Sequence, residues 1–473
     1  MFRGKAQGDP RPRSDVSAMV GWVGLAGLAA WVAFARSYPE FADWADLPGP
    51  REVMSGPHAA LAALFAAALP MALWSLFVDK VHRNPSTGID WSLRKGRAPN
   101  RRDSLTKIVG LWATFAVIAA LYCLARWYWS GNYLFSLKVI GWSAIPLAVL
   151  TVPYIFWIDR VLERPRDHAW HFGRLVLLRR DWEPEQVYKH WRIWGIKAFF
   201  TAFMISITPF AFHNIVTAEW SQVFARPERV ALLAIEAMFM VDVVIGSVGY
   251  IVTMRPLDAH IRSGNPFLGG WVAALICYPP LVWGILGNGQ VIFYEENTRD
   301  WVHWFAREGE YLGQGWLSSF GWAEAQTALV SLWGAIVVFL TAIYAWATLV
   351  FGLRFSNLTY RGVVTHGPYR LTRHPAYVSK NLFWWFATMP FMVTSDSWVD
   401  VIRNCFFLAV VNAIYYWRAK TEEAHLLAED DKYREYHAWM ARNGWLTAPL
   451  AKLTAAFKRR FAPQPSASPS PVS

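Results

Sequence analysis

The chain has 473 residues, of which 55% are apolar, 16% are aromatic and only 17% are charged. This composition excludes an ordinary soluble domain and indicates a membrane protein. The formal net charge of +12 would favour nucleic acid as the partner of a soluble protein. In a membrane protein that charge belongs to the loops on one side of the bilayer, so no nucleic-acid partner is expected.

Apolar runs of roughly 18 to 25 residues recur along most of the chain, each long enough to cross a hydrocarbon core of about 30 Å. The predicted fold class is therefore all-α, a polytopic integral membrane helical bundle of about ten transmembrane helices. The predicted spans are 17–35, 58–78, 108–128, 138–158, 197–216, 230–254, 268–287, 326–353, 379–396 and 399–417.

The basic residues predict the orientation of this bundle. With the N-terminus inside, an even number of spans returns the C-terminus to the cytoplasm, and the acidic loop 288–325 lies outside. The basic loops that then share the cytoplasmic side are 79–107, 159–195, 255–267 and 354–378. The frequent Ala, Arg and Trp residues hint at a bacterial source, so the expected location is the bacterial cytoplasmic (inner) membrane.

Composition divides the chain into four segments. A cytoplasmic tail, 1–16, precedes a membrane region of about seven spans, 17–325, to which the sequence assigns no function. A second membrane region, 326–445, carries the motifs described below. The segment 446–473 is basic and then rich in Pro and Ser, and we expect this end to be disordered because it has few apolar groups.

The first span has a basic lead-in, and its Ala-Phe-Ala sequence at 33–35 matches a signal-peptidase site. Its length and the membrane pattern that follows favour an uncleaved helix. Cys123, Cys277 and Cys405 lie in separate apolar runs, which predicts neither disulfides nor a thiolate metal site.

Two acids, Glu236 and Asp242, lie inside the predicted span 230–254. A charged side chain is costly there unless it faces a cavity or a partner within the bundle. The two residues are six positions apart and do not share a helix face cleanly. A structural hydrogen bond and a functional role both stay open for them.

A cluster of metal-ligand types occurs in the loop 159–195, where a His-x-x-His pair on a helical turn could in principle hold a metal. Its members are Asp167, His168, His171 and His190. No further ligand stands at a recognisable spacing, and the tryptophans of this loop favour an amphipathic segment on the membrane surface. No metal site is therefore predicted.

A polar loop leads directly into a tryptophan-rich span in the sequence THGPYRLTRHPAYVSKNLFWW, residues 365–385. Pro375 suits the first turn of a helix and forces His374 into an extended conformation. The free N–H groups of this helix end favour an anionic group, such as a carboxylate or phosphate. Neighbouring side chains that add charge, rings and hydroxyls are Tyr369, Arg370, Arg373 and Tyr377. An ordinary cytoplasmic loop with interfacial aromatics is the alternative.

A second polar cluster follows the last span, at residues 415–440, where apolar residues recur at helical spacing and predict an amphipathic helix. Arg418 and Glu422 are four positions apart and share a face. A solvated salt-bridge ladder would explain these charges alone. Because both clusters fall on one side of the membrane around a helical hairpin, 379–417, we expect them to converge on one site.

Together, these residues resemble the C-terminal half of the isoprenylcysteine carboxyl methyltransferase and phospholipid methyltransferase families of integral membrane enzymes. The matching pattern is G-x-Y-x-x-x-R-H-P-x-Y, then R-x-x-x-E-E-x-x-L, then Y-x-x-Y, over roughly residues 340 to 445. The chain departs from the family at Ser379, where the family often has Gly, and at the polar pair Lys380-Asn381 that follows. It also has Asp430-Asp431 in place of the usual F-G before the Tyr pair. The N-terminal region has no counterpart in the resemblance.

The resemblance implies a methyltransferase that binds S-adenosylmethionine between the two motifs, on the cytoplasmic side, and acts on a lipophilic or membrane-associated acceptor. It implies cofactor-binding roles for His366, Gly367, Tyr369, Arg373, His374, Pro375, Tyr377, Glu422 and Glu423, and catalytic roles for Arg418 and Glu422. The cofactor offers a carboxylate to the helix end, an ammonium to the glutamates and a sulfonium to aromatic rings, in agreement with the residue types.

Two other functions stay open. An NADPH-dependent sterol-type reductase also carries an R-H-P-x-Y element, but it usually continues with an Asp-x-x-Cys-x-x-Lys-Tyr pattern that is missing here. A transporter or assembly protein with a non-catalytic methyltransferase-like end would explain the long N-terminal region and its intramembrane acids. Binding of NADPH rather than S-adenosylmethionine would identify the first.

Overall fold

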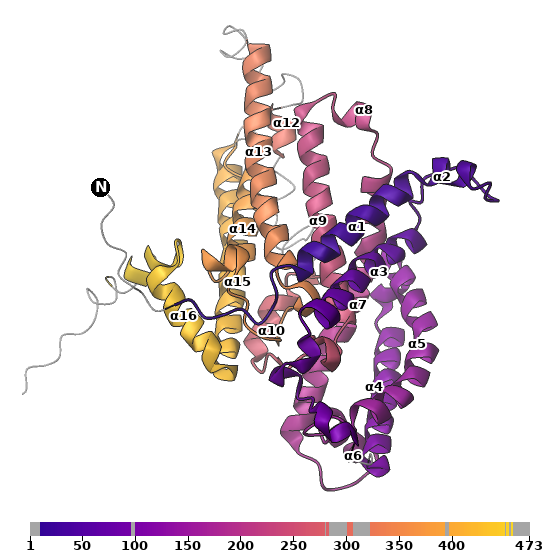
Figure 1. Cartoon of the computed structure of the whole chain (residues 1–473). Coiled ribbons are helices and arrows are strands. Elements are labelled where there is room, and N and C mark those ends of the chain that lie inside the picture. Colours follow the sequence, from indigo (N-terminus) through magenta and orange to yellow (C-terminus); the bar gives the residue numbers. More distant parts are fainter. Residues whose placement is uncertain are drawn as a thin grey trace, which may run out of the picture.

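The structure, a computed structural model, describes residues 10–95, 100–279, 281–282, 300–305, 322–392, 397–449, 451–453 and 456. These residues are predominantly helical (Figure 1). One short ladder pairs β1 (Ser263–Gly264) antiparallel with β2 (Thr359–Tyr360). The prediction of an all-α membrane bundle is confirmed at this level. The tail expected to be disordered lies mostly outside the described residues.

Seven helices of the described part are long and apolar enough to cross a membrane, or eight if one bent pair counts as a span. They are α3 (Pro57–Leu73) continued by a π-helical turn to Val78, α4 (Arg101–Leu124), α5 (Gly131–Ile158), α7 (Pro184–Val216), α9 (Pro227–Ile251), α13 (Trp322–Leu349) and α15 (Trp398–Glu429). The bent pair is α1 (Val20–Arg36) and α2 (Tyr38–Trp44), which meet at 64°.

Two other predicted spans correspond to shorter helices. The span 268–287 begins with α10 (Leu268–Leu275), and its residues 280 and 283–287 lie outside the described residues. The span 379–396 corresponds to α14 (Pro375–Thr388), which has 14 residues. The count of ten spans therefore stays a prediction. The remaining short helices are α6 (His168–Val176), α8 (Trp220–Val223), α12 (Trp301–Phe305) and α16 (Asp431–Asn443).

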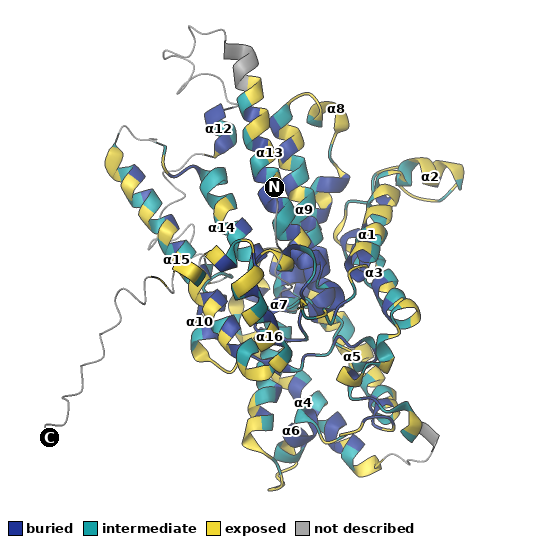
Figure 2. Ribbon diagram, turned by 60° about the vertical axis from the view of Figure 1, so that its left-hand side comes forward, coloured by how far each residue is buried: buried dark blue, intermediate teal, exposed yellow. Residues whose placement is uncertain are grey.

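Helix α9 packs between α7 and α13, and buried residues concentrate there, whereas α5 presents exposed residues to the outside (Figure 2). On α5, Trp142 and Ile145 are 59% and 75% exposed. Apolar side chains exposed on a long helix are suited to contact with lipid tails. On α9, a Cβ on Gly249 would lie 2.2 Å from the Phe355 carbonyl oxygen, so the missing side chain lets a loop approach the helix closely.

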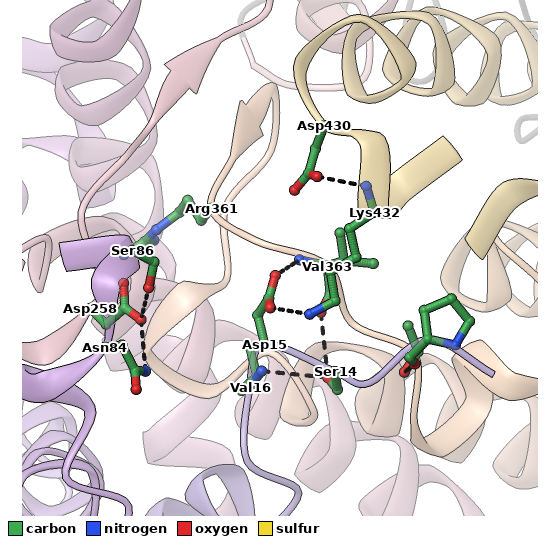
Figure 3. Close-up of polar contacts among 12 residues, drawn as sticks. Ser14, Asp15, Val16, Asn84, Ser86, Asp258, Arg361, Val363, Asp430 and Lys432 are labelled. Atoms are coloured by element: carbon green, nitrogen blue, oxygen red, sulfur yellow. Dashed lines mark hydrogen bonds and ion pairs between the residues drawn. The ribbon is translucent and has the colours of Figure 1, made fainter. Parts of the chain in front are cut away.

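The four loops predicted for one side of the membrane lie together. Residues 88 and 163 share a backbone hydrogen bond, which joins the loops 79–107 and 159–195. The Asp258 carboxylate accepts a hydrogen bond from Ser86 Oγ at 2.6 Å, which joins 79–107 to 255–267 (Figure 3). It also accepts one from Arg354 Nη2 at 2.6 Å, which joins 255–267 to 354–378. This buried ion pair therefore fixes the loop that precedes α14.

The chain breaks between α15 and α16 at Asp430, whose Oδ1 accepts a hydrogen bond from the Lys432 N–H at 2.8 Å. Aspartate is a favoured N-cap because its side chain satisfies a free N–H of the first turn. The prediction of one continuous helix over 415–440 was therefore wrong. The break turns α16 back toward the N-terminal segment (Figure 1).

Residues 10–16 cross the loop 361–366 and contact α16 (Figure 3). The Val363 N–H donates to Asp15 Oδ2 at 2.7 Å, and the Asp15 N–H donates to the Val363 carbonyl at 2.8 Å. Lys432 forms an ion pair with the same aspartate. The N-terminal segment and the C-terminal helix therefore lie on the same side of the bundle.

Candidate functional site

A cavity of about 360 Å³ lies where α7, α9, α13, α14 and α15 meet the loop before α14. One wall is apolar and comes from the middle of α7 and α9, with Phe203, Ile207 and Phe239. A second, polar part of the lining, called the polar wall, comes from the two motifs singled out in the sequence. The motif residues that line it are Tyr369, Arg373, His374, Tyr377, Arg418 and Glu422. Both sequence clusters thus meet at one cavity.

Arg418 lies at the centre of the polar wall, and its side chain is only 3% exposed. Its guanidinium carbon lies 5.2 Å from the ring centroid of Tyr377 and 5.5 Å from that of Tyr278. Its Nε lies 3.3 Å from Glu422 Oε1, which also accepts a 2.6 Å hydrogen bond from the Tyr377 hydroxyl. The two rings and the carboxylate hold the guanidinium in one orientation.

Glu423 is enclosed by basic groups instead of lining the cavity. Its Oε1 lies 2.6 Å from Arg373 Nε and 3.0 Å from His374 Nε2. Its Oε2 lies 2.7 Å from Lys420 Nζ, and His437 of α16 is 4.0 Å away. These contacts attach the loop before α14 to α15. Burial, followed by the charge of Arg373, lowers the pKa of His437.

Three further predicted cofactor residues, His366, Gly367 and Pro375, do not line the cavity. His366 Nδ1 is 2.9 Å from Ser14 Oγ, and burial, followed by the charge of Arg11, lowers its pKa. Gly367 has a φ of +59°, and a Cβ there would lie 2.8 Å from Val350 Cγ1, so this turn requires glycine. Pro375 is the first residue of α14, as predicted. These residues shape the wall from outside.

Several helices of the bundle supply cavity residues that the motifs did not include. They are Asp242 on α9, Tyr344 and Thr348 on α13, Lys380 on α14, Tyr415 on α15, and Tyr278 after α10. In the sequence, Asp242 was recognisable as an intramembrane acid, and Lys380 was recognisable as a departure from the family pattern. The sequence did not mark the tyrosines as cavity residues, because tyrosine is common at membrane interfaces. Glu236, the other intramembrane acid, is exposed.

The His-rich loop makes contacts within the protein. His168 Nδ1 lies 2.9 Å from His190 Nδ1, His171 Nδ1 accepts a hydrogen bond from the Glu183 N–H, and Asp167 pairs with Lys107 at 3.2 Å. In the described part of the chain, no group of three or more His, Cys, Asp or Glu side chains could hold a metal ion. The three cysteines are free, and Cys277 lines the cavity.

Comparisons with known proteins found no matching family model, no matching curated protein and no matching solved structure. The resemblance to methyltransferases therefore rests on the motifs alone.

Proposed function

We propose that this chain is an integral membrane, S-adenosylmethionine-dependent methyltransferase that acts on a lipophilic or membrane-associated acceptor. The observation that carries the proposal is the meeting of two distant motifs at one cavity, where Arg418 pairs with Glu422 beside Tyr377. The cavity volume of about 360 Å³ lies within the range of small-molecule sites. The cavity has both apolar and polar lining, which suits a polar cofactor and an apolar acceptor.

The side chains of the cavity have the chemistry that the cofactor requires. Arg373 and Arg418 are cations for its carboxylate, Glu422 is an anion for its ammonium, and tyrosine rings can face a sulfonium. When bound, the cofactor would supply an electrophilic methyl group. The contribution of the protein is positioning: Tyr377 and Arg418 orient Glu422, and the apolar wall holds the acceptor away from water.

We further propose that the bundle has about ten spans, with both termini and the polar wall of the cavity on the cytoplasmic side of a bacterial inner membrane. The contact between residues 10–16 and α16 supports termini on one side. The assembly of the four basic loops supports the assignment of that side, because such loops favour the cytoplasm.

Cofactor binding by the full chain in lipid nanodiscs tests the proposal. We expect S-adenosylmethionine to bind in calorimetry, NADPH not to bind, and labelled methyl groups to enter a lipid extract. Glu422→Gln should weaken cofactor binding at least 10-fold, because the ammonium loses its anion. The matched control, Glu236→Gln, changes an exposed acid of α9 and should bind normally.

Two outcomes would contradict this function. Binding of NADPH without S-adenosylmethionine would favour the reductase. A cellular activity that survives both Glu422→Gln and His374→Ala would favour a transporter or assembly protein.

A further inference from the structure

The apolar end of the cavity contains one buried carboxylate, Asp242, which is 8% exposed. Its Oδ2 accepts a 2.9 Å hydrogen bond from the Tyr344 hydroxyl, and its Oδ1 accepts one from Thr348 Oγ1. Both donors lie on α13, and both line the same cavity. The carboxylate is therefore held in a fixed orientation beside the cavity.

A cation lies on the other side of Tyr344. The Lys380 Nζ is 5.4 Å from the ring centroid of Tyr344 and 5.6 Å from that of Tyr415. Two hydroxyl donors and a nearby ammonium offset part of the cost of keeping Asp242 charged inside the bundle. The other cations that line the cavity have partners of their own: Arg354 pairs with Asp258, Arg373 with Glu423 and Arg418 with Glu422, and Arg361 donates to backbone carbonyls.

The packing of α9 against α13 does not require a charged side chain at position 242. A neutral hydroxyl at position 242 has two acceptor lone pairs and could pair with donors on α13 without the cost of a buried charge. Phe203, Ile207 and Phe239 surround this end of the cavity with apolar surface. An acceptor whose apolar part lies against them would bring its reacting atom toward the acid.

We propose that Asp242 is the general base for an acceptor with a protic nucleophile, a thiol or a hydroxyl on an apolar body. The inference rests on the proposed function. The bond between the acceptor sulfur or oxygen and the methyl carbon forms while the C–S bond of the sulfonium donor breaks and its electron pair stays on sulfur. The acceptor proton moves to Asp242, which later releases it to water. Tyr344 and Thr348 are positioning residues for the carboxylate.

An acceptor series of graded acidity tests this role, with the full chain in nanodiscs and alkyl-substituted phenols and thiophenols as acceptors. Asp242→Asn should lower kcat about 100-fold for the least acidic acceptors, because general-base catalysis contributes at least this factor. For acceptors already ionised at the assay pH the loss should be less than threefold. Tyr344→Phe should show a smaller loss with the same dependence on acidity, and Glu236→Gln should show none.

Cofactor affinity and the unfolding temperature are measured for each variant, and both should stay near the wild-type values. An equal loss by Asp242→Asn across the series, or a wild type that methylates carboxylic acids alone, would overturn this role while the proposed function stands. A wild type that binds no S-adenosylmethionine would remove the proposed function and this inference together.

Discussion

Glu422 and Glu423 are neighbours in the sequence but have different surroundings. Successive residues of a helix point about 100° apart, since there are 3.6 residues per turn. Glu422 therefore faces the cavity, whereas Glu423 faces the loop before α14, where Arg373, His374 and Lys420 surround it. The first can serve a ligand, and the second attaches that loop to the helix.

Replacing Glu423 by Gln should lower the free energy of unfolding by about 3 kcal/mol, because Arg373 would keep a largely buried charge without its partner. Thermal unfolding of the detergent-solubilised protein measures this change. Glu429→Gln is the matched control, since its side chain is 36% exposed on the same helix. An unfolding temperature for Glu423→Gln equal to that of the control would contradict the assignment.

His168 in the loop 159–195 is partly buried, and it makes stability depend on pH. Burial lowers the pKa of His168 to about 4, whereas the unfolded side chain titrates near about 6.5. The unfolded state therefore binds a proton that the folded state does not, and stability is fully present above about pH 6.5 and lost as the pH falls toward about 4. The predicted loss is roughly 2–3 kcal/mol.

Unfolding temperatures between pH 7.5 and pH 4.5 measure this effect. His168→Gln should have a shallower acid dependence than the wild type, because the titrating group is removed. Parallel curves for the two proteins would show that His168 does not contribute.

At the scale of elements, the candidate site depends on segments that do not carry its motifs. Residues 10–16 hold the loop 361–366 through hydrogen bonds to Val363 and an ion pair with Lys432 of α16. Gly362, with a φ of +111°, has no side chain to block Asp15. The loop that ends at His374 is thus held from one side by the N-terminal segment and from the other by α15.

Asp15→Asn should loosen this loop, because the amide cannot pair with Lys432 and its oxygen is a weaker acceptor for the Val363 N–H. We expect faster hydrogen exchange at residues 361–366, with exchange in α7 unchanged. Asp43→Asn is the control, since this aspartate is 68% exposed and far from the loop. Equal exchange in both variants would show that the loop is held without Asp15.

At the scale of the whole molecule, the polar loops and the apolar lining of the cavity come from different parts of the bundle. Four loops and both described ends of the chain gather at one side, while the middles of α7 and α9 close the cavity from within the bundle. Under the proposed function, a methyl donor from water and an acceptor from lipid would reach such a cavity from different directions. This arrangement follows from helices that cross the bilayer with most of their charged residues near their ends, Asp242 of α9 being an exception.

The sequence by itself determined the membrane class, the start of α14 at Pro375 and the presence of two motifs around a hairpin, because these depend on local composition and spacing. Only the tertiary structure decided that Asp242, Tyr344 and Tyr278 complete the cavity, and that Glu423 faces away from it. Hydropathy does not distinguish which faces of the helices pack together, since an apolar side chain such as leucine is equally compatible with lipid tails and with a neighbouring helix. Small residues and a few polar contacts between distant spans determine which helix faces meet.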